Sequence, residues 1–115
     1  MKDKKRRINK CHYSCSVEAA LDVIGGKWKG VILFHLLENK KRFNELRRLI
    51  PSVSLRMLTL QLRELENDGV ILRTVYQQVP PKVEYELTKF GKSLKPILID
   101  LQKWGNQIMQ NEIEK

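Results

Sequence analysis

The segment from residue 42 to residue 87 constrains the fold most strongly, because two helix-like stretches lead directly into two strand-like stretches. RFNELRRLI has apolar residues at helical spacing and is stopped by Pro51. After the turn PSV, Ser54 can cap a helix over LRMLTLQLRELEND, which Gly69 ends. VILRTVYQQ is rich in β-branched and aromatic residues, KVEYEL alternates apolar with polar residues, and VPP between them forbids helix. This order predicts an α+β, mostly helical winged helix-turn-helix domain.

Helices are also expected on both sides of this unit. The first has apolar residues at the spacing of one helical face and is stopped by the glycines at 25 and 26: Val17, Ala20, Leu21 and Ile24. The second is expected from about residue 27 to residue 37, with four residues on its inner face: Trp28, Val31, Ile32 and His35. Thr88 should cap one long final helix, in which Pro96 should cause a bend and free one backbone carbonyl.

The charge of the chain predicts an anionic partner. Lys and Arg total 22 against 13 acidic residues in 115, a formal net charge of +9, which favours nucleic acid first and an anionic membrane surface second. The length suits one domain, with a basic arm at residues 1–14 and a folded part at 15–115. Two cysteines are too few for a disulfide scaffold, and no secretory signal or spanning segment is evident, so we expect a cytoplasmic protein.

The basic residues of the helix-turn-helix are candidates for DNA contacts. In such a motif the second helix enters the major groove and the hairpin lies against the flanking backbone. Arg56, Thr59 and Arg63 share the helix face opposite the leucines, where Arg can bind guanine and Thr a thymine methyl or a phosphate. Phosphate contacts are expected nearby and at the hairpin tip: Ser54, Arg47, Arg48, Lys41 and Lys82. The alternative interpretation is a solvated helix face.

The last helix carries more apolar surface than a core of this size needs. Its apolar residues recur every three or four positions: Phe90, Leu94, Ile97, Leu101, Trp104 and Ile108. Part of this stripe should therefore face a second copy of the chain, although it can also serve the protomer's own core. In a dimer, the two reading helices would meet a pseudo-palindrome of double-stranded DNA with half-sites about 34 Å apart.

Five motifs, in order, carry a resemblance to a known family: CSVE at 15–18, GGKWK at 25–29, RFNELRR at 42–48, MLTLQLRELENDG at 57–69 and VPPKVEYELTKFGKSL at 79–94. Over residues 15 to about 105 the chain resembles the HxlR-type winged-helix transcriptional regulators of the MarR-like superfamily. The resemblance implies a homodimeric DNA-binding regulator that dimerises through its first and last helices, for which we expect these interface residues: Val17, Leu21, Leu94, Ile97, Leu101, Trp104 and Ile108. The family commonly has Pro after the cysteine, where this chain has Ser16, which also suits a helix start.

The only two cysteines lie in CHYSC at 11–15. Cys11, His12 and Cys15 offer at most three ligands, so no metal site is expected, and a reducing compartment disfavours a stable disulfide between them. Cys15 stands at a helix start, where the macrodipole favours a thiolate while Glu18 opposes it. The resemblance implies that some relatives sense oxidants or electrophiles at this cysteine, sometimes through an intersubunit disulfide, and that others have no established sensing role. A small buried packing residue with an inert thiol is the alternative.

Enzymatic activity is not expected. The two histidines, His12 and His35, are 23 positions apart, and no nucleophile-base-acid set or nucleotide loop accompanies them. No cofactor is implied, and the identity of any small-molecule or oxidant effector stays open. A winged helix can also serve as a protein-interaction module, although its reading helix would then more often be apolar or mixed than basic.

Overall fold

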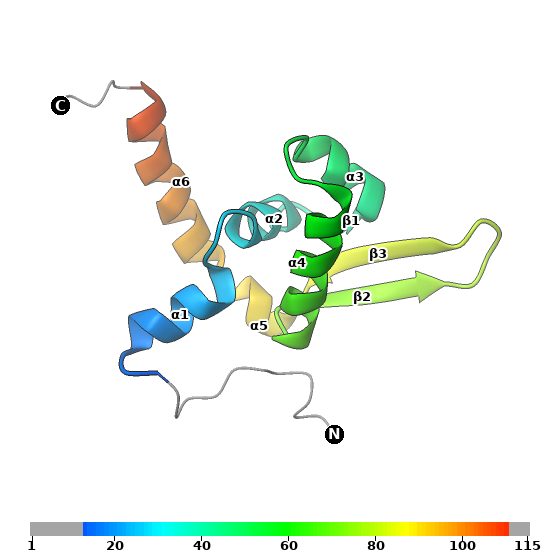
Figure 1. Ribbon diagram of the computed structural model, residues 1–115, viewed down its shortest axis with the longest axis horizontal. Coiled ribbons are helices and arrows are strands. Elements are labelled where there is room, and N and C mark those ends of the chain that lie inside the picture. The colour runs from blue at the N-terminus through cyan, green and yellow to red at the C-terminus, as the bar shows by residue number, and fades with distance from the viewer. Residues whose placement is uncertain (1–12, 111–115) are drawn as a thin grey trace.

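The computed structural model describes residues 13–110. Within this range six helices and three short strands follow one another in the order α1, α2, β1, α3, α4, β2, β3, α5, α6 (Figure 1). Their bounds are α1 Ser16–Ile24, α2 Lys29–Leu36, β1 Lys41–Arg42, α3 Phe43–Leu49, α4 Leu55–Asn67, β2 Ile71–Tyr76, β3 Lys82–Leu87, α5 Lys89–Lys92 and α6 Lys95–Gln110. This mixed, mostly helical architecture confirms the predicted fold class.

The central helix-turn-helix and the hairpin form where the sequence predicts them. The Ser54 side chain accepts a hydrogen bond from the Met57 backbone N–H at 3.0 Å and so caps α4. Gly69 ends α4 in the left-handed conformation with φ 81°, which a residue with a Cβ rarely adopts. Strands β2 and β3 then pair antiparallel from Ile71 with Leu87 to Tyr76 with Lys82, and the connecting turn holds a cis peptide bond before Pro80.

A third strand was not predicted from the sequence. The two residues of β1 pair antiparallel with β3, Lys41 opposite Tyr85 and Arg42 opposite Glu84, which gives the sheet order β1-β3-β2. This pairing ties the start of α3 to the base of the wing, the projecting β2–β3 hairpin. The wing therefore leaves the body of the protein at a fixed place beside α3 and α4 (Figure 1).

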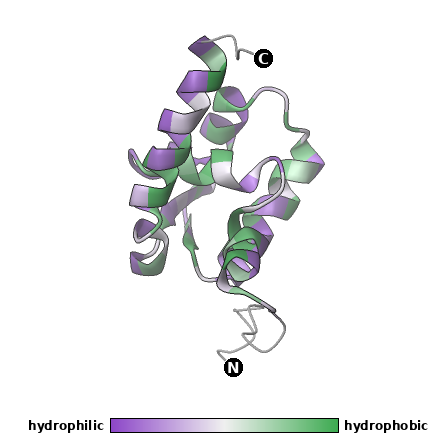
Figure 2. Ribbon diagram, turned by 90° about the vertical axis from the view of Figure 1, so that its left-hand side faces the viewer, coloured by the Kyte–Doolittle hydropathy of each residue, from purple (hydrophilic) through white to green (hydrophobic). Residues whose placement is uncertain are grey.

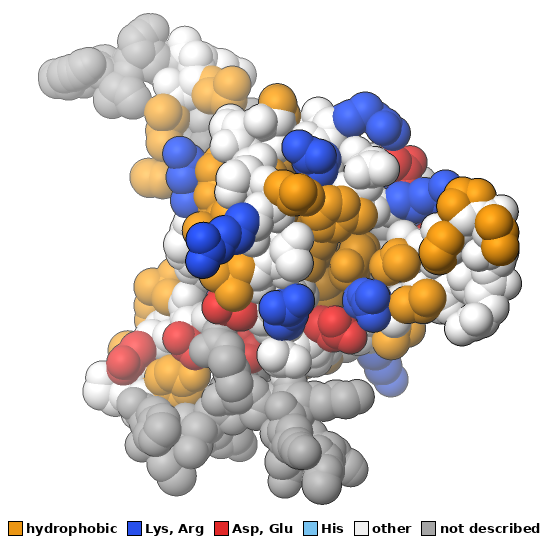
Figure 3. All heavy atoms as spheres, turned by 45° about the vertical axis from the view of Figure 1, so that its right-hand side comes forward, with side chains coloured by type: hydrophobic (Ala, Val, Ile, Leu, Met, Phe, Trp, Pro, Cys, Tyr) orange, Lys and Arg blue, Asp and Glu red, His pale blue; other side chains and the backbone are white. Residues whose placement is uncertain are grey.

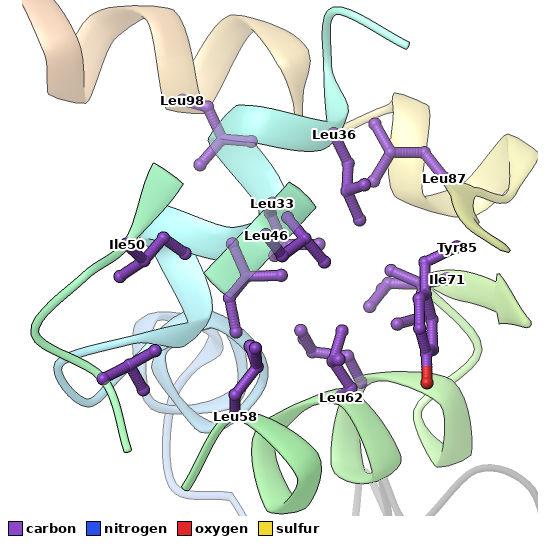
Figure 4. Packing of buried hydrophobic residues seen from close by; sticks show 14 of the residues in the cluster. Leu33, Leu36, Leu46, Ile50, Leu58, Leu62, Ile71, Tyr85, Leu87 and Leu98 are labelled. Carbon is purple, nitrogen blue, oxygen red and sulfur yellow. The ribbon is translucent and has the colours of Figure 1, made fainter. Parts of the chain in front are cut away.

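One hydrophobic core joins the helices to the sheet. Figure 4 shows Leu33 and Leu36 of α2 between Leu98 of α6 and side chains from α3, α4 and the wing strands. Of the leucine stripe predicted for α4, Leu58, Leu62 and Leu65 are buried, whereas Leu55 is 52% exposed and lies outside the core.

The inner face predicted for α2 is partly wrong. Ile32 is buried and Trp28 packs against the core, but Val31 is exposed and His35 is only half-buried. The buried positions are instead Lys29, Ile32, Leu33 and Leu36. Burial is the main influence that lowers the pKa of His35 below its ordinary value, and the nearby charge of Lys41 adds to it.

The prediction of a single long final helix is also wrong. Thr88 acts as a cap, but for the short helix α5: its hydroxyl accepts from the Gly91 N–H at 3.0 Å. Residues 93 and 94 then form a turn that interrupts the helix, and α6 begins at Lys95. Pro96 therefore lies in the first turn of α6, where its missing N–H would have had no helical partner, and it does not bend the helix from within.

No helix of the described part, residues 13–110, is both long enough and apolar enough to cross a membrane. The basic arm predicted at residues 1–14 lies almost entirely outside the described residues, as do Cys11 and His12.

Candidate nucleic-acid interface

The outer face of α4 and one side of the wing form a common exposed surface. Arg56, Thr59 and Arg63 are all exposed, on the face of α4 opposite the buried leucines. The Thr59 hydroxyl donates to the Leu55 carbonyl oxygen at 3.0 Å, which leaves its methyl group and lone pairs outward. Figure 3, with the wing side turned forward, shows Lys and Arg side chains spread over this surface among hydrophobic ones, with few acidic side chains between them.

Of the basic residues on α3 and β1 that were expected to contact phosphates, the arginines are exposed and the lysine is buried. Arg47 and Arg48 are exposed in the last turn of α3, on the helix that precedes the turn into α4. Lys41 is only 8% exposed, and its ammonium group lies 2.6 Å from Asn39 Oδ1 and 3.5 Å from Glu38 Oε1. Because its charge is already bound inside the protein, we leave Lys41 out of the proposed interface.

Glu84 forms ion pairs with two lysines at the wing. Its carboxylate lies 3.6 Å from the Lys40 ammonium and 3.7 Å from the Lys82 ammonium. Partial burial acts to raise the pKa of Glu84, but a hydrogen bond from Tyr76 and the two lysines outweigh it and keep that pKa below its ordinary value. Lys82 also lies over the Tyr76 ring, 4.8 Å from its centroid. The candidate Lys82 is thus held in place and partly neutralised.

A polar cleft separates α4 from the base of the wing. It has a volume of about 350 Å³ and is lined by Phe43, Thr59, Arg63, Glu66, Arg73 and Tyr85. Arg73, exposed in β2, was not among the candidates from the sequence. Strand alternation alone places it on one face of the hairpin, but only the folded chain brings it to the same cleft as Arg63 on α4.

Replacing Glu84 by Gln is expected to strengthen DNA binding several-fold at low salt. The change removes the carboxylate that screens Lys40 and Lys82, so that each ammonium can pair with a phosphate and release a counterion. Fluorescence anisotropy over a series of salt concentrations should give a log–log slope steeper by about one to two for each bound subunit. Glu38→Gln, which changes an exposed carboxylate beside the buried Lys41, should leave the slope unchanged. Weaker binding by the Glu84 variant would contradict the screening role.

Comparison with known proteins places the chain in a family. A model described as HxlR-like helix-turn-helix matches residues 23–113. The chain belongs to the HxlR-like helix-turn-helix family. It is 62% identical over 93 residues to the HTH-type transcriptional regulator YdeP of Bacillus subtilis, a match that covers 81% of this chain and 73% of YdeP.

Solved structures agree with this assignment. The redox regulator HypR in its oxidised form is 57% identical, with a TM-score of 0.80, and the match covers 86% of this chain and 100% of the HypR chain. The HTH-type transcriptional regulator YtcD is 60% identical, with a TM-score of 0.79 over 84% of this chain and 99% of that one. The protein is accordingly an HTH-type transcriptional regulator, like the relatives named above.

In this HxlR-family chain, Cys15 is the N-cap of α1 and is exposed within the protomer. Its side chain makes no capping hydrogen bond, and the Glu18 carboxylate in the first turn of α1 accepts from both the Ser14 N–H and the Ser14 hydroxyl at 2.8 Å. These bonds, the backbone one first, lower the pKa of Glu18 below its ordinary value. The protomer does not bury Cys15 as a packing residue, and a carboxylate, that of Glu18, lies in the first turn of the same helix.

The apolar residues expected at a dimer interface lie mostly on the side of the HxlR fold opposite the wing, on α1 and α6 (Figure 1). Six of the seven are exposed by at least 46%: Val17, Leu21, Ile97, Leu101, Trp104 and Ile108. Leu94 is partly buried and packs on the protomer's own core. With this side in front, Figure 2 shows hydrophobic and hydrophilic residues alternating along α6. Met109, 84% exposed, extends the apolar surface beyond the predicted stripe.

Proposed function

We propose that this HxlR-family regulator is a homodimer that binds a pseudo-palindromic sequence in double-stranded DNA. The observation that carries the proposal is the exposed row Arg56, Thr59 and Arg63 on a capped helix, beside a wing that presents Lys82 and Arg73. The helix has the length and the side chains to read base edges in a major groove. In this proposal Ser54, Arg47 and Arg48 contact phosphates around it and fix the register.

A dimer is supported by the apolar surface on α1 and α6. A groove of about 360 Å³ lies between α2 and α6 and is lined in part by Val31, Phe34 and Leu101. Contiguous exposed apolar surface of this kind marks an interaction site, and two-fold symmetry would match the symmetry of the DNA site.

In vitro selection of duplex DNA by the reduced protein tests this function. We expect recovery of an inverted repeat with half-site centres about 34 Å apart or a multiple of that distance. Binding to the selected sequence should weaken steeply as salt rises. Recovery of random sequence, bound no better than bulk DNA, would favour the alternative of a protein-interaction module.

A thiol switch at Cys15 is the second part of the proposal, supported by the exposure of the thiol and by the likeness to a redox regulator. Modification at the start of α1 would act next to Val17 and Leu21 in the proposed interface, and so would change how the two reading helices are spaced. Repeating the DNA selection after diamide treatment tests it. If the treated protein, the untreated protein and the Cys15→Ser variant all bind the selected DNA with the same affinity, this family member is a thiol-independent regulator.

Replacing Glu18 by Gln is expected to raise the rate at which iodoacetamide alkylates Cys15. The amide keeps an oxygen that can accept from Ser14 but removes a negative charge from the first turn of α1, and iodoacetamide reacts with the anionic form of the sulfur. Chymotryptic cleavage after Tyr13, which lies between the two cysteines, followed by mass spectrometry gives the rate for Cys15 separately from that for Cys11. Glu84→Gln, on the wing strand, serves as the control and should not change this rate. A slower or equal rate in the Glu18 variant would show that the carboxylate does not restrain the thiol.

A further inference from the structure

A charged residue occupies a core position of α2. Lys29 falls on the same helical face as Ile32, Leu33 and Leu36, and its side chain is only 9% exposed. Its ammonium lies 2.7 Å from Glu64 Oε1, on the C-terminal half of α4, and the Glu64 side chain is 35% exposed. The two residues are far apart in sequence, so this contact joins α2 directly to the helix that carries Arg56 and Arg63.

Stability alone does not account for such a pair. Removing the Lys29 ammonium and part of the Glu64 carboxylate from water costs about as much as their attraction returns, and apolar residues of similar size at such a site are often equally or more stabilising. The pair instead adds geometric specificity. A short charge-assisted hydrogen bond fixes the distance between two groups more narrowly than apolar contact does. Lys29 therefore restricts where α4 can lie along and around α2.

Helix α2 is itself fixed to the side of the molecule that carries α1 and α6. Leu98 of α6 packs into the core beside Leu33 (Figure 4). Between α1 and α2, Gly26 has a φ of 81°, and a side chain at Gly25 would collide with the carbonyl oxygen of Leu21. The turn is thus tight, and Lys29 begins α2 a few residues after it.

We propose that Lys29 and Glu64 are positioning residues, whose ion pair sets the angle of α4 relative to α2 and so the presentation of Arg56 and Arg63 to DNA. This inference rests on the proposed function, in which α4 reads the operator. The pair links the helices of the proposed dimer interface to the reading helix, so it also contributes to the spacing between the two half-sites.

The test replaces the pair by apolar residues in Lys29→Met/Glu64→Leu, which leaves the net charge unchanged. Its melting temperature should equal or exceed that of the wild type. Its preference for the selected operator over random duplex should nevertheless fall about tenfold, with random binding unchanged. The reversed pair Lys29→Glu/Glu64→Lys should regain part of that preference. Glu38→Gln, which removes the carboxylate partner of the equally buried Lys41, should keep the wild-type preference.

Hydrogen exchange measured without DNA separates this inference from the proposed function. Backbone amides of residues 55–67 should exchange faster in the apolar double variant than in wild type and in Glu38→Gln. The positioning role would be overturned if the apolar double variant showed the same exchange rates in α4 and the same operator preference as the wild type. If the wild type itself prefers no sequence, the proposed function fails, and exchange in α4 still decides whether the pair positions the helix.

Discussion

The double variant Arg56→Ala/Arg63→Ala is expected to bind the selected operator no better than random duplex DNA. A bidentate contact from Arg to guanine contributes about 1–3 kcal/mol of discrimination against other bases. Two such contacts are lost in each subunit, and each loss reduces the preference by about 5-fold to 140-fold. Anisotropy titrations with operator and random duplexes, at one fixed salt concentration, measure the preference directly.

Folding should be unaffected by these two substitutions, because both side chains are exposed and the buried face of α4 is unchanged. Arg47→Ala is the matched control: removal of a phosphate contact should weaken binding to all sequences alike and reduce the salt slope by about one for each bound subunit. If the double variant kept the wild-type preference for the operator, α4 would not be the reading helix.

The helix-turn-helix and hairpin were predictable because their signals are local. Pro51 stops α3, the Ser54 hydroxyl caps α4 and Gly69 ends it, and each of these acts through the backbone within a few residues. The exposed face of Arg56 and Arg63 follows from helical periodicity once those ends are known.

The inner face of α2 could not be predicted from its periodicity. Its sequence KGVILFHL is apolar on nearly every side, so that no single stripe marks the buried face. Lys29, the residue that a polar–apolar pattern would place outside, is buried because a carboxylate from another helix neutralises it. The two-residue strand β1 has no pattern of its own and exists only by pairing with β3.

The same limit applies to the candidate site. Lys41 and Lys82 look alike in a sequence, but folding binds the first to Asn39 inside the protein and places the second over Tyr76 beside Glu84. Arg73 joins Arg63 at one cleft through the path of β2 beside α4. Charge counts predict the class of partner, whereas the tertiary contacts decide which charges remain available to it.

Replacement of Trp104 by Glu is expected to convert the protein to a monomer at micromolar concentration and to weaken operator binding by about a hundredfold or more. Trp104 is 63% exposed, in the middle of the apolar surface of α6, so that a carboxylate there would be buried unpaired in a dimer. A monomer reads only one half-site and loses the effective concentration that joins the two binding events.

The fold of the Trp104 variant should survive, because this side chain lies outside the protomer's core whereas Leu98, on the same helix, is 2% exposed within it. Sedimentation velocity gives the oligomeric state, and circular dichroism gives the helix content and melting temperature. Lys103→Glu places the same charge one residue away, turned by about 100° around α6, and should leave a dimer. A dimeric Trp104→Glu protein with wild-type operator affinity would exclude this face of α6 from the interface, and the exposed residues of α1 would then have to form it without α6.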